Sequence, residues 1–248
     1  MADTPADNTS VETPWSGVVI PMAGAGTASV VRIPVPGTQG LCIQLDPPGG
    51  YKNSTSTLFF VENPGKRYGR QLRLDYGPYK LPSGQQGVGY HWNQSQTHQT
   101  FGISDHTPAT GASPSLYRFA RYFRYSGRFL GVVGVATDTI SVVQADRPLR
   151  RATEVVSGWA GAWAGCEVVG AGGGAAGFWA GSAAPLVGNA AGAAIGGIGG
   201  CILGAAGGYW VGSTVAGIAY DWAEDTSFRP LLISSEAEVR AWLHGDGR

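Results

Sequence analysis

Residues 188–212 read GNAAGAAIGGIGGCILGAAGGYWVG, with glycine at every fourth position. The row is Gly188, Gly192, Gly196, Gly200, Gly204, Gly208 and Gly212. A glycine costs a water-soluble helix about 1 kcal/mol relative to alanine, so such a row requires a compensating contact. Helices in a bilayer obtain that contact because small residues four apart let two backbones touch. The row therefore predicts a membrane-helix interface, a glycine zipper.

The preceding stretch repeats this spacing, and no charged residue lies between Glu167 and Asp221. Its glycines on the four-residue step are Gly161 and Gly165, then Gly173, Gly177 and Gly181. Pro185 separates the two rows. Each half is longer than the roughly 20 residues that cross a hydrocarbon core. We therefore expect a helical hairpin over residues 154–222, with Pro185 near its tip and both halves able to insert into a membrane.

A four-residue row is inclined to the helix axis and drifts away from a single straight partner after a few turns. We therefore expect more than one neighbouring helix, from a bundle or from a homo-oligomer formed on insertion. A compact soluble hairpin and a mobile linker are the alternatives, because Gly/Ala segments are only weakly apolar. Tryptophans near the ends of the apolar stretches favour the membrane; they are Trp159, Trp163, Trp179, Trp210 and Trp222.

The chain has 248 residues and a formal net charge of zero, and its composition changes sharply near Arg151. This charge balance argues against non-specific nucleic-acid binding, which normally requires a basic surface. Residues 1–14 are polar and acidic, so we expect a disordered tail rather than a signal peptide. Made in the cytoplasm, such a chain would need a dedicated secretion machine or a fused carrier for export.

The three cysteines, Cys42, Cys166 and Cys201, have no short paired spacing, which argues against a zinc ribbon or a redox motif. Cys166 and Cys201 lie at comparable distances from Pro185, so a hairpin could bring them together. We interpret them as small apolar residues of packed helices in a reduced protein, with a disulfide as the alternative.

Residues 15–110 predict a small β-rich domain, because short apolar runs alternate with Gly/Pro turns. The expected strands are 17–20, 28–33, 40–45, 57–61, 71–76, 89–92 and 100–103, and residues 107–115 form a closing loop. With the helices that follow, the fold class is α+β: an N-terminal β-rich domain, a basic amphipathic helix and a glycine-zipper hairpin. Residues 223–248 are expected to form a soluble tail with a strand at 231–233 and a short helix from Ser235.

Residues 115–150 predict a basic amphipathic helical segment with aromatic residues between its arginines. Arg118, Arg121, Arg124 and Arg128 are three and four residues apart and share a face. This pattern is typical of helices that bind an anionic membrane surface, and an acidic groove of a partner protein is a second possibility. The alternative is a soluble helix on the β domain. Arg150 and Arg151 precede the glycine rows, and the positive-inside tendency places that flank in the cytoplasm.

The densest polar cluster lies between Arg70 and His106. A metal-independent nuclease could use His91 and His106 as acid and base, with Arg73 as an anion clamp. Asp105 and the histidines could instead bind a metal, although their spacing matches no metal signature. Hydrogen-bonded surface histidines are the simpler interpretation. The sequence contains no phosphate-loop, dinucleotide or nucleophile-elbow motif, so we expect no cofactor.

Three motifs in order carry a family resemblance: LRLDY at residues 72–76, HWN at 91–93 and FGISDH at 101–106, followed by the basic helix and the glycine zipper. This arrangement resembles carboxy-terminal regions of bacterial polymorphic toxins, including Rhs-type and type VI secretion effectors. The resemblance covers most of residues 70–222. It implies an antibacterial effector delivered by specialised secretion to a target-cell membrane, with a cognate immunity protein, and it assigns no catalytic residue.

Three functional hypotheses follow. The first is an effector that inserts its zipper hairpin into lipid and permeabilises the membrane, and is not an enzyme. The second is a toxin enzyme that uses the Arg73, His91 and His106 group, with the glycine-rich segment serving translocation. The third is an anchoring protein whose hairpin attaches the β domain to a membrane.

Overall fold

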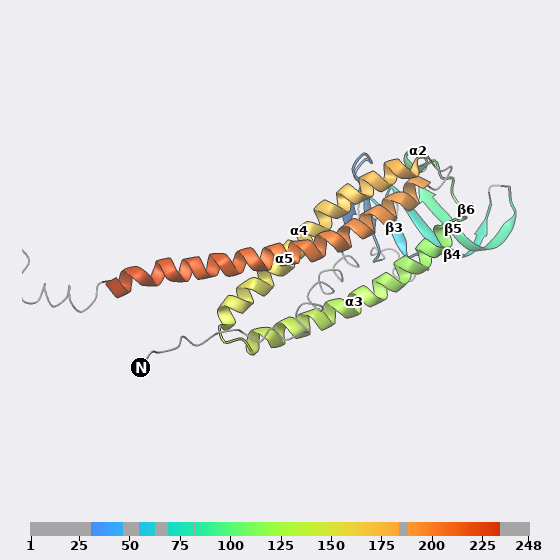
Figure 1. Cartoon of the computed structure of the whole chain (residues 1–248). Helices are drawn as coiled ribbons and strands as arrows, with labels where there is room; N and C mark the ends of the chain where they lie inside the picture. The colour runs from blue at the N-terminus through green and yellow to red at the C-terminus, as the bar shows by residue number, and fades with distance from the viewer. Residues whose placement is uncertain (1–30, 47–54, 63–68, 82, 184–187, 234–248) are drawn as a thin grey trace, which may run out of the picture.

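The structure, a computed structural model, describes residues 31–46, 55–62, 69–81, 83–183 and 188–233, with side chains up to residue 226. The expected tail at 1–14, the strand at 17–20, Pro185 and the helix after Ser235 lie outside these residues. Figure 1 shows a small sheet at one end of three long helices. The α+β class is confirmed.

Six antiparallel strands form the sheet, and each pairs with the next strand along the chain. They are β1 (Ile33–Pro34), β2 (Cys42–Gln44), β3 (Leu58–Val61), β4 (Gln71–Lys80), β5 (Gln86–Ser95) and β6 (Thr107–Pro108). Because side chains alternate along a strand, Leu72 and Leu74 share one face while Arg73 and Asp75 share the other. β4 therefore has an apolar face and a polar face, whereas all four side chains of β3 are buried.

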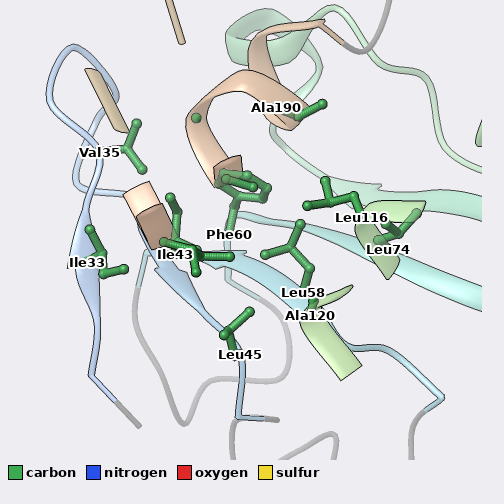
Figure 2. Close-up of a cluster of buried hydrophobic side chains, with 14 of the residues drawn as sticks. Ile33, Val35, Ile43, Leu45, Leu58, Phe60, Leu74, Leu116, Ala120 and Ala190 are labelled. Atoms are coloured by element: carbon green, nitrogen blue, oxygen red, sulfur yellow. The ribbon is translucent and has the colours of Figure 1, made fainter. Parts of the chain in front are cut away.

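The apolar face is packed against the helices. Figure 2 shows Ile43, Leu58 and Phe60 of the sheet beside Leu116 and Ala120, which come from the helix after β6. Burying one such aliphatic or aromatic side chain contributes about 1.5–3 kcal/mol, so this cluster attaches the sheet to the helices.

The long helices are α3 (Ser113–Val143), α4 (Pro148–Gly181) and α5 (Gly188–Ile233). In Figure 1, α3 runs away from the sheet, α4 returns and crosses α5, and α5 continues past the start of α4. The expected basic helix is present as α3, but it ends at Val143 rather than at residue 150, because Pro148 begins α4 in the first-turn position that suits proline. The glycine of α3 at position 127 is buried and does not break that helix.

Two expected strands are wrong. In place of the strand at 100–103, residues 100 and 101 belong to the short helix α2 (His98–Phe101). This helix ends where Gly102 adopts a left-handed backbone with φ 69°. The Phe101 ring then packs against Phe60, with ring centroids 5.0 Å apart. Residues 231–233 are helical because α5 continues through them, so the expected boundary of a soluble tail at residue 223 does not coincide with a helix end.

Candidate functional site

The glycine rows of α4 and α5 face one another along the whole hairpin. Gly161 lies opposite Gly208, Gly165 opposite Gly204, Gly173 opposite Gly196, Gly177 opposite Gly192, and Gly181 opposite Gly188. A methyl group on these α4 glycines would overlap a backbone carbonyl oxygen of α5. The two helices are therefore in backbone contact, as the zipper pattern predicts.

Within one chain the α5 row has a single neighbouring helix rather than the several expected, while the homo-oligomer formed on insertion stays a prediction. The two remaining α5 glycines also face α4, where Gly200 meets the carbonyl of Val169 and Gly212 meets that of Ser157. Both helices carry the same four-residue spacing, so they can wind around each other instead of drifting apart. α4 alone occupies the row.

The cysteines correct a second expectation. Cys166 of α4 and Cys201 of α5 form a disulfide, with their Cα atoms 3.7 Å apart. The interpretation as small apolar residues of a reduced protein is therefore wrong, and the alternative, a disulfide, is present. Backbone contact in the zipper brings the two sulfur atoms within bonding reach, which spacing along the sequence could not establish. Cys42 remains a free thiol, and burial raises its pKa.

Two described helices are long and apolar enough to cross a membrane by length and composition: α3, over Ser113–Val143, and α5, over Gly188–Thr226. Only 17% of the most apolar window of α3 is buried, against 50% for α5. α4 does not pass the same test, contrary to the expectation for both halves of the hairpin. Glu167 lies in its middle and interrupts the apolar run.

Exposed apolar side chains are concentrated on the three helices. Among the described large hydrophobic residues that are exposed, only Tyr76 and Val88 lie outside α3, α4 and α5. Val132 on α3 is 71% exposed and Leu203 on α5 is 73% exposed. Large apolar side chains exposed in such number are typical of a site of contact with a membrane or another protein.

These side chains lie in a segment almost free of charge. We call residues 129–143 of α3, 155–166 of α4 and 203–220 of α5 the apolar band; its only charged residue is Asp138. At 1.5 Å per helical residue these parts are about 23 Å, about 18 Å and about 27 Å long. A hydrocarbon core is about 30 Å thick. Its exposed apolar members are Phe129, Val132, Val135, Ile140, Val143, Val156, Trp163, Leu203, Trp210, Val211, Val215 and Ile218.

Charged groups border the band on both sides. On the side of the sheet, Arg128 pairs with Asp46. On the far side, Arg147 and Arg150 both contact Asp221, at 3.1 and 2.8 Å, and Arg147 also contacts Glu224. The hydrogen bond to Asp221 raises the pKa of Arg150 above its usual range. The far border is thus a compact set of ion pairs in which arginines and carboxylates neutralise one another.

The basic face of α3 lies between the sheet and the apolar band. Arg118 and Arg121 are exposed, and the aromatic residues Phe119 and Tyr122 beside them are also exposed. Arg124 lies over the Tyr125 ring, 5.0 Å from its centroid. Arginines next to exposed aromatic rings suit the boundary between lipid headgroups and hydrocarbon.

The polar residues singled out on β4 and β5 meet on the other face of the sheet. Asp75 accepts hydrogen bonds from Arg73, at 2.9 Å, and from Ser56 and Asn93. The Asn93 amide in turn contacts His91 Nε2 at 3.1 Å. The structure therefore joins Arg73 and His91 through Asp75 and Asn93.

His91 is only 4% exposed. Its Nδ1 contacts the carbonyl of Gly89 at 3.1 Å, so both ring nitrogens have protein partners. The Tyr79 ring stacks on it with centroids 4.8 Å apart, and Gly87 and Gly89 leave room for that ring. Alternation along β4 places Tyr79 on the face of Asp75, whereas nothing in the sequence indicates the contribution of Ser56.

His106 is the more accessible histidine, with its side chain 40% exposed. Its ring centroid lies 5.9 Å from that of His91, and its Nε2 lies 3.5 Å from Asp105. It borders a surface pocket of about 530 Å³ that Tyr79, Lys80 and Gln86 also line. Among the described residues, no three His, Cys, Asp or Glu side chains are grouped to hold a metal ion.

Comparison of the chain with protein-family models, curated proteins and solved structures gave no match.

Proposed function

We propose that this protein inserts α3, α4 and α5 together into a target membrane and permeabilises it. The observation that carries this proposal is the apolar band, where large apolar side chains point outward over about 23 Å of α3 and about 27 Å of α5, against about 30 Å for a hydrocarbon core. In water these side chains would remain hydrated. Transferring one fully exposed Leu or Ile to lipid releases about 1.5–3 kcal/mol, and the band holds many such residues.

The zipper explains how the helices stay together in lipid. Hydrocarbon chains are as apolar as the helix surfaces, so no hydrophobic force holds two helices together there. Close backbone packing supplies the attraction instead, and the facing rows of α4 and α5 provide that packing. α4 then accompanies α5, although it does not qualify as a span by itself.

Arginines lie at both borders of the band: Arg147, Arg150 and Arg151 at the far border, and the basic face of α3 at the border beside the sheet. The positive-inside tendency therefore does not select one orientation. The disulfide fits a protein that acts outside a reducing cytosol, because disulfides persist in oxidising compartments.

The resemblance to polymorphic toxins supports an antibacterial effector, carried to the target cell by a specialised secretion apparatus and neutralised in the producing cell by an immunity protein. A conducting path would require several copies. Because α4 occupies the glycine row of α5, those copies would meet through the outward faces of the three-helix unit.

Dye leakage from vesicles of bacterial lipid tests this proposal with two variants of equal composition. Gly196→Ala/Gly200→Ala/Gly204→Ala places three methyl groups of α5 against the backbone of α4. Gly172→Ala/Gly199→Ala/Gly207→Ala places them in open space, one on α4 and two on α5. We expect leakage with the wild type and the second variant, and at least a tenfold lower rate with the first, as a loss of about 1.4 kcal/mol would give. Equal leakage from all three would contradict a zipper-dependent mechanism.

The polar network and pocket on the sheet favour a second candidate, the toxin enzyme. In that case vesicles would stay intact, and protein made in the cytosol would remain toxic after the zipper substitutions but not after His106→Ala. The burial of His91 favours a supporting role for that residue and leaves His106 as the histidine that borders the pocket.

A further inference from the structure

Asp138 is the one ionisable acid within the apolar band, and it lies near the middle of the α3 part of that band. It is 4% exposed. A carboxylate at this depth is costly in lipid, and ionisable residues inside membranes are as a rule functional. Its position therefore calls for an explanation beyond packing.

The carboxyl group lies where the three helices meet. Its Oδ2 accepts a hydrogen bond of 2.8 Å from the indole nitrogen of Trp159 on α4, and its Oδ1 faces the Tyr209 hydroxyl of α5 at 3.5 Å. Gly158 provides the space for the Tyr209 ring, because a Cβ there would lie 2.9 Å from it. Two helices thus direct polar groups at one acid on the third.

The surrounding charges leave this acid without a dedicated cation. Arg151 of α4 is a cation that acts on Asp138, but its guanidinium bonds Glu154 at 3.2 Å and the Ser141 hydroxyl at 3.1 Å. α5 carries no charge between its start and Asp221, so Tyr209 is the titratable group facing Asp138 from that helix. The side chains that bond the acid directly, Trp159 and Tyr209, are therefore neutral, and the charge of Arg151 is shared with Glu154.

We propose that Asp138 is a proton-binding site that makes membrane insertion depend on acidity; this rests on the function proposed above. An ionised Asp138 is accommodated while Trp159 and Tyr209 donate to it, which holds α3 against the hairpin. To enter lipid, α3 must carry Asp138 either as a carboxylate or as a neutral acid. The neutral acid forms when the carboxylate takes up a proton from water. Protonation removes the charge, so insertion rises as pH falls.

The test uses full-length protein and vesicles of bacterial lipid, with leakage measured from about pH 7.5 to about pH 4.5, a range that covers carboxyl titration. Asp138→Asn removes the titration and keeps the shape and one acceptor oxygen. We expect wild-type leakage to rise by at most about tenfold per pH unit, the limit for one proton, and Asp138→Asn leakage to be nearly flat at the acidic wild-type level.

Two controls separate titration from damage. Asp146→Asn removes an exposed carboxylate just beyond the C-terminal end of α3, outside the band, and should retain the wild-type pH dependence. Tyr209→Phe removes the longer hydrogen bond but leaves the acid, so its leakage should also still rise in acid. Helix content from circular dichroism confirms that each variant is folded.

Three results would overturn the proposal. An Asp138→Asn variant with the wild-type pH dependence would show that another group takes up the proton. Wild-type leakage that is equal at every pH would remove the proton site and leave the insertion proposal standing. A wild type that leaks at no pH would end both proposals.

Discussion

Two glycines of α5 that look alike in the sequence have opposite surroundings. A Cβ on Gly204 would overlap the carbonyl of Gly165, whereas a Cβ on Gly199 meets nothing within 4 Å. Both lie inside a helix, where alanine is favoured over glycine by about 1 kcal/mol. Only the four-residue register distinguishes them, so at this scale the zipper is a property of individual positions.

We therefore expect Gly204→Ala and Gly199→Ala to change stability in opposite directions. Gly204→Ala must separate two backbones and should lower the free energy of unfolding by about 1–3 kcal/mol, the usual cost of overpacking. Gly199→Ala should raise it by up to about 1 kcal/mol. Denaturant titration in a mild detergent, followed by circular dichroism, measures both. Similar changes for the two variants would be inconsistent with the zipper contacts.

At the scale of the element, α3 combines two surfaces along one helix. Its N-terminal half presents Arg118 and Arg121 with exposed aromatic rings, and its C-terminal half presents the exposed valines and Ile140 of the apolar band. Leu116 and Ala120 attach its first turns to the sheet. The arrangement suits a helix that meets headgroups first and hydrocarbon next.

For this helix, Arg118→Gln/Arg121→Gln should weaken binding to vesicles that contain anionic lipid. Each arginine near such a surface contributes about 1 kcal/mol, so the double variant should bind roughly 30-fold less tightly at low salt. The difference should shrink as salt is added, because the attraction is screened. Vesicle sedimentation measures this, and Lys80→Gln on the distant β4–β5 turn is the control. A double variant that binds like wild type would show that lipid charge is not recognised here.

At the scale of the whole molecule, the Cys166–Cys201 disulfide joins the two halves of the hairpin close to the sheet. Gly170 of α4 lies between the sheet and α5: a Cβ there would be 3.0 Å from Ile33 of β1 and 3.2 Å from the Cβ of Cys201. The bond closes a loop with a sequence separation of 35. Sheet, α4 and α5 are thus linked at one place.

Reduction of this disulfide should lower the free energy of unfolding by about 3–4 kcal/mol, the loop-entropy contribution for a loop of this size. Thiol titration of denatured protein should find one free thiol, Cys42, before reduction and three after it. Denaturation is needed because burial raises the pKa of Cys42 and slows its reaction. Cys42→Ser should keep the reductant effect. Three free thiols in oxidised protein would exclude the bond.

The sequence by itself determined what depends on local spacing. The four-residue glycine rows, the hairpin and the division into strands and long helices follow from periodicity along one chain. Short apolar runs between Gly/Pro turns likewise predicted the strand at residues 71–76, which the structure extends to Lys80. The local pattern wrongly predicted a strand at residues 100–103. Gly102 and the packing of Phe101 favour a helical turn there.

Only the tertiary structure decided which distant groups meet. It paired the α5 row with α4 alone, joined Cys166 to Cys201, buried His91 and placed Asp138 between Trp159 and Tyr209. These outcomes depend on how helices cross and which faces they cover. The local spacing of a residue does not show which distant residue it will contact. Spacing fixes the face on which a residue lies, but packing fixes what that face touches.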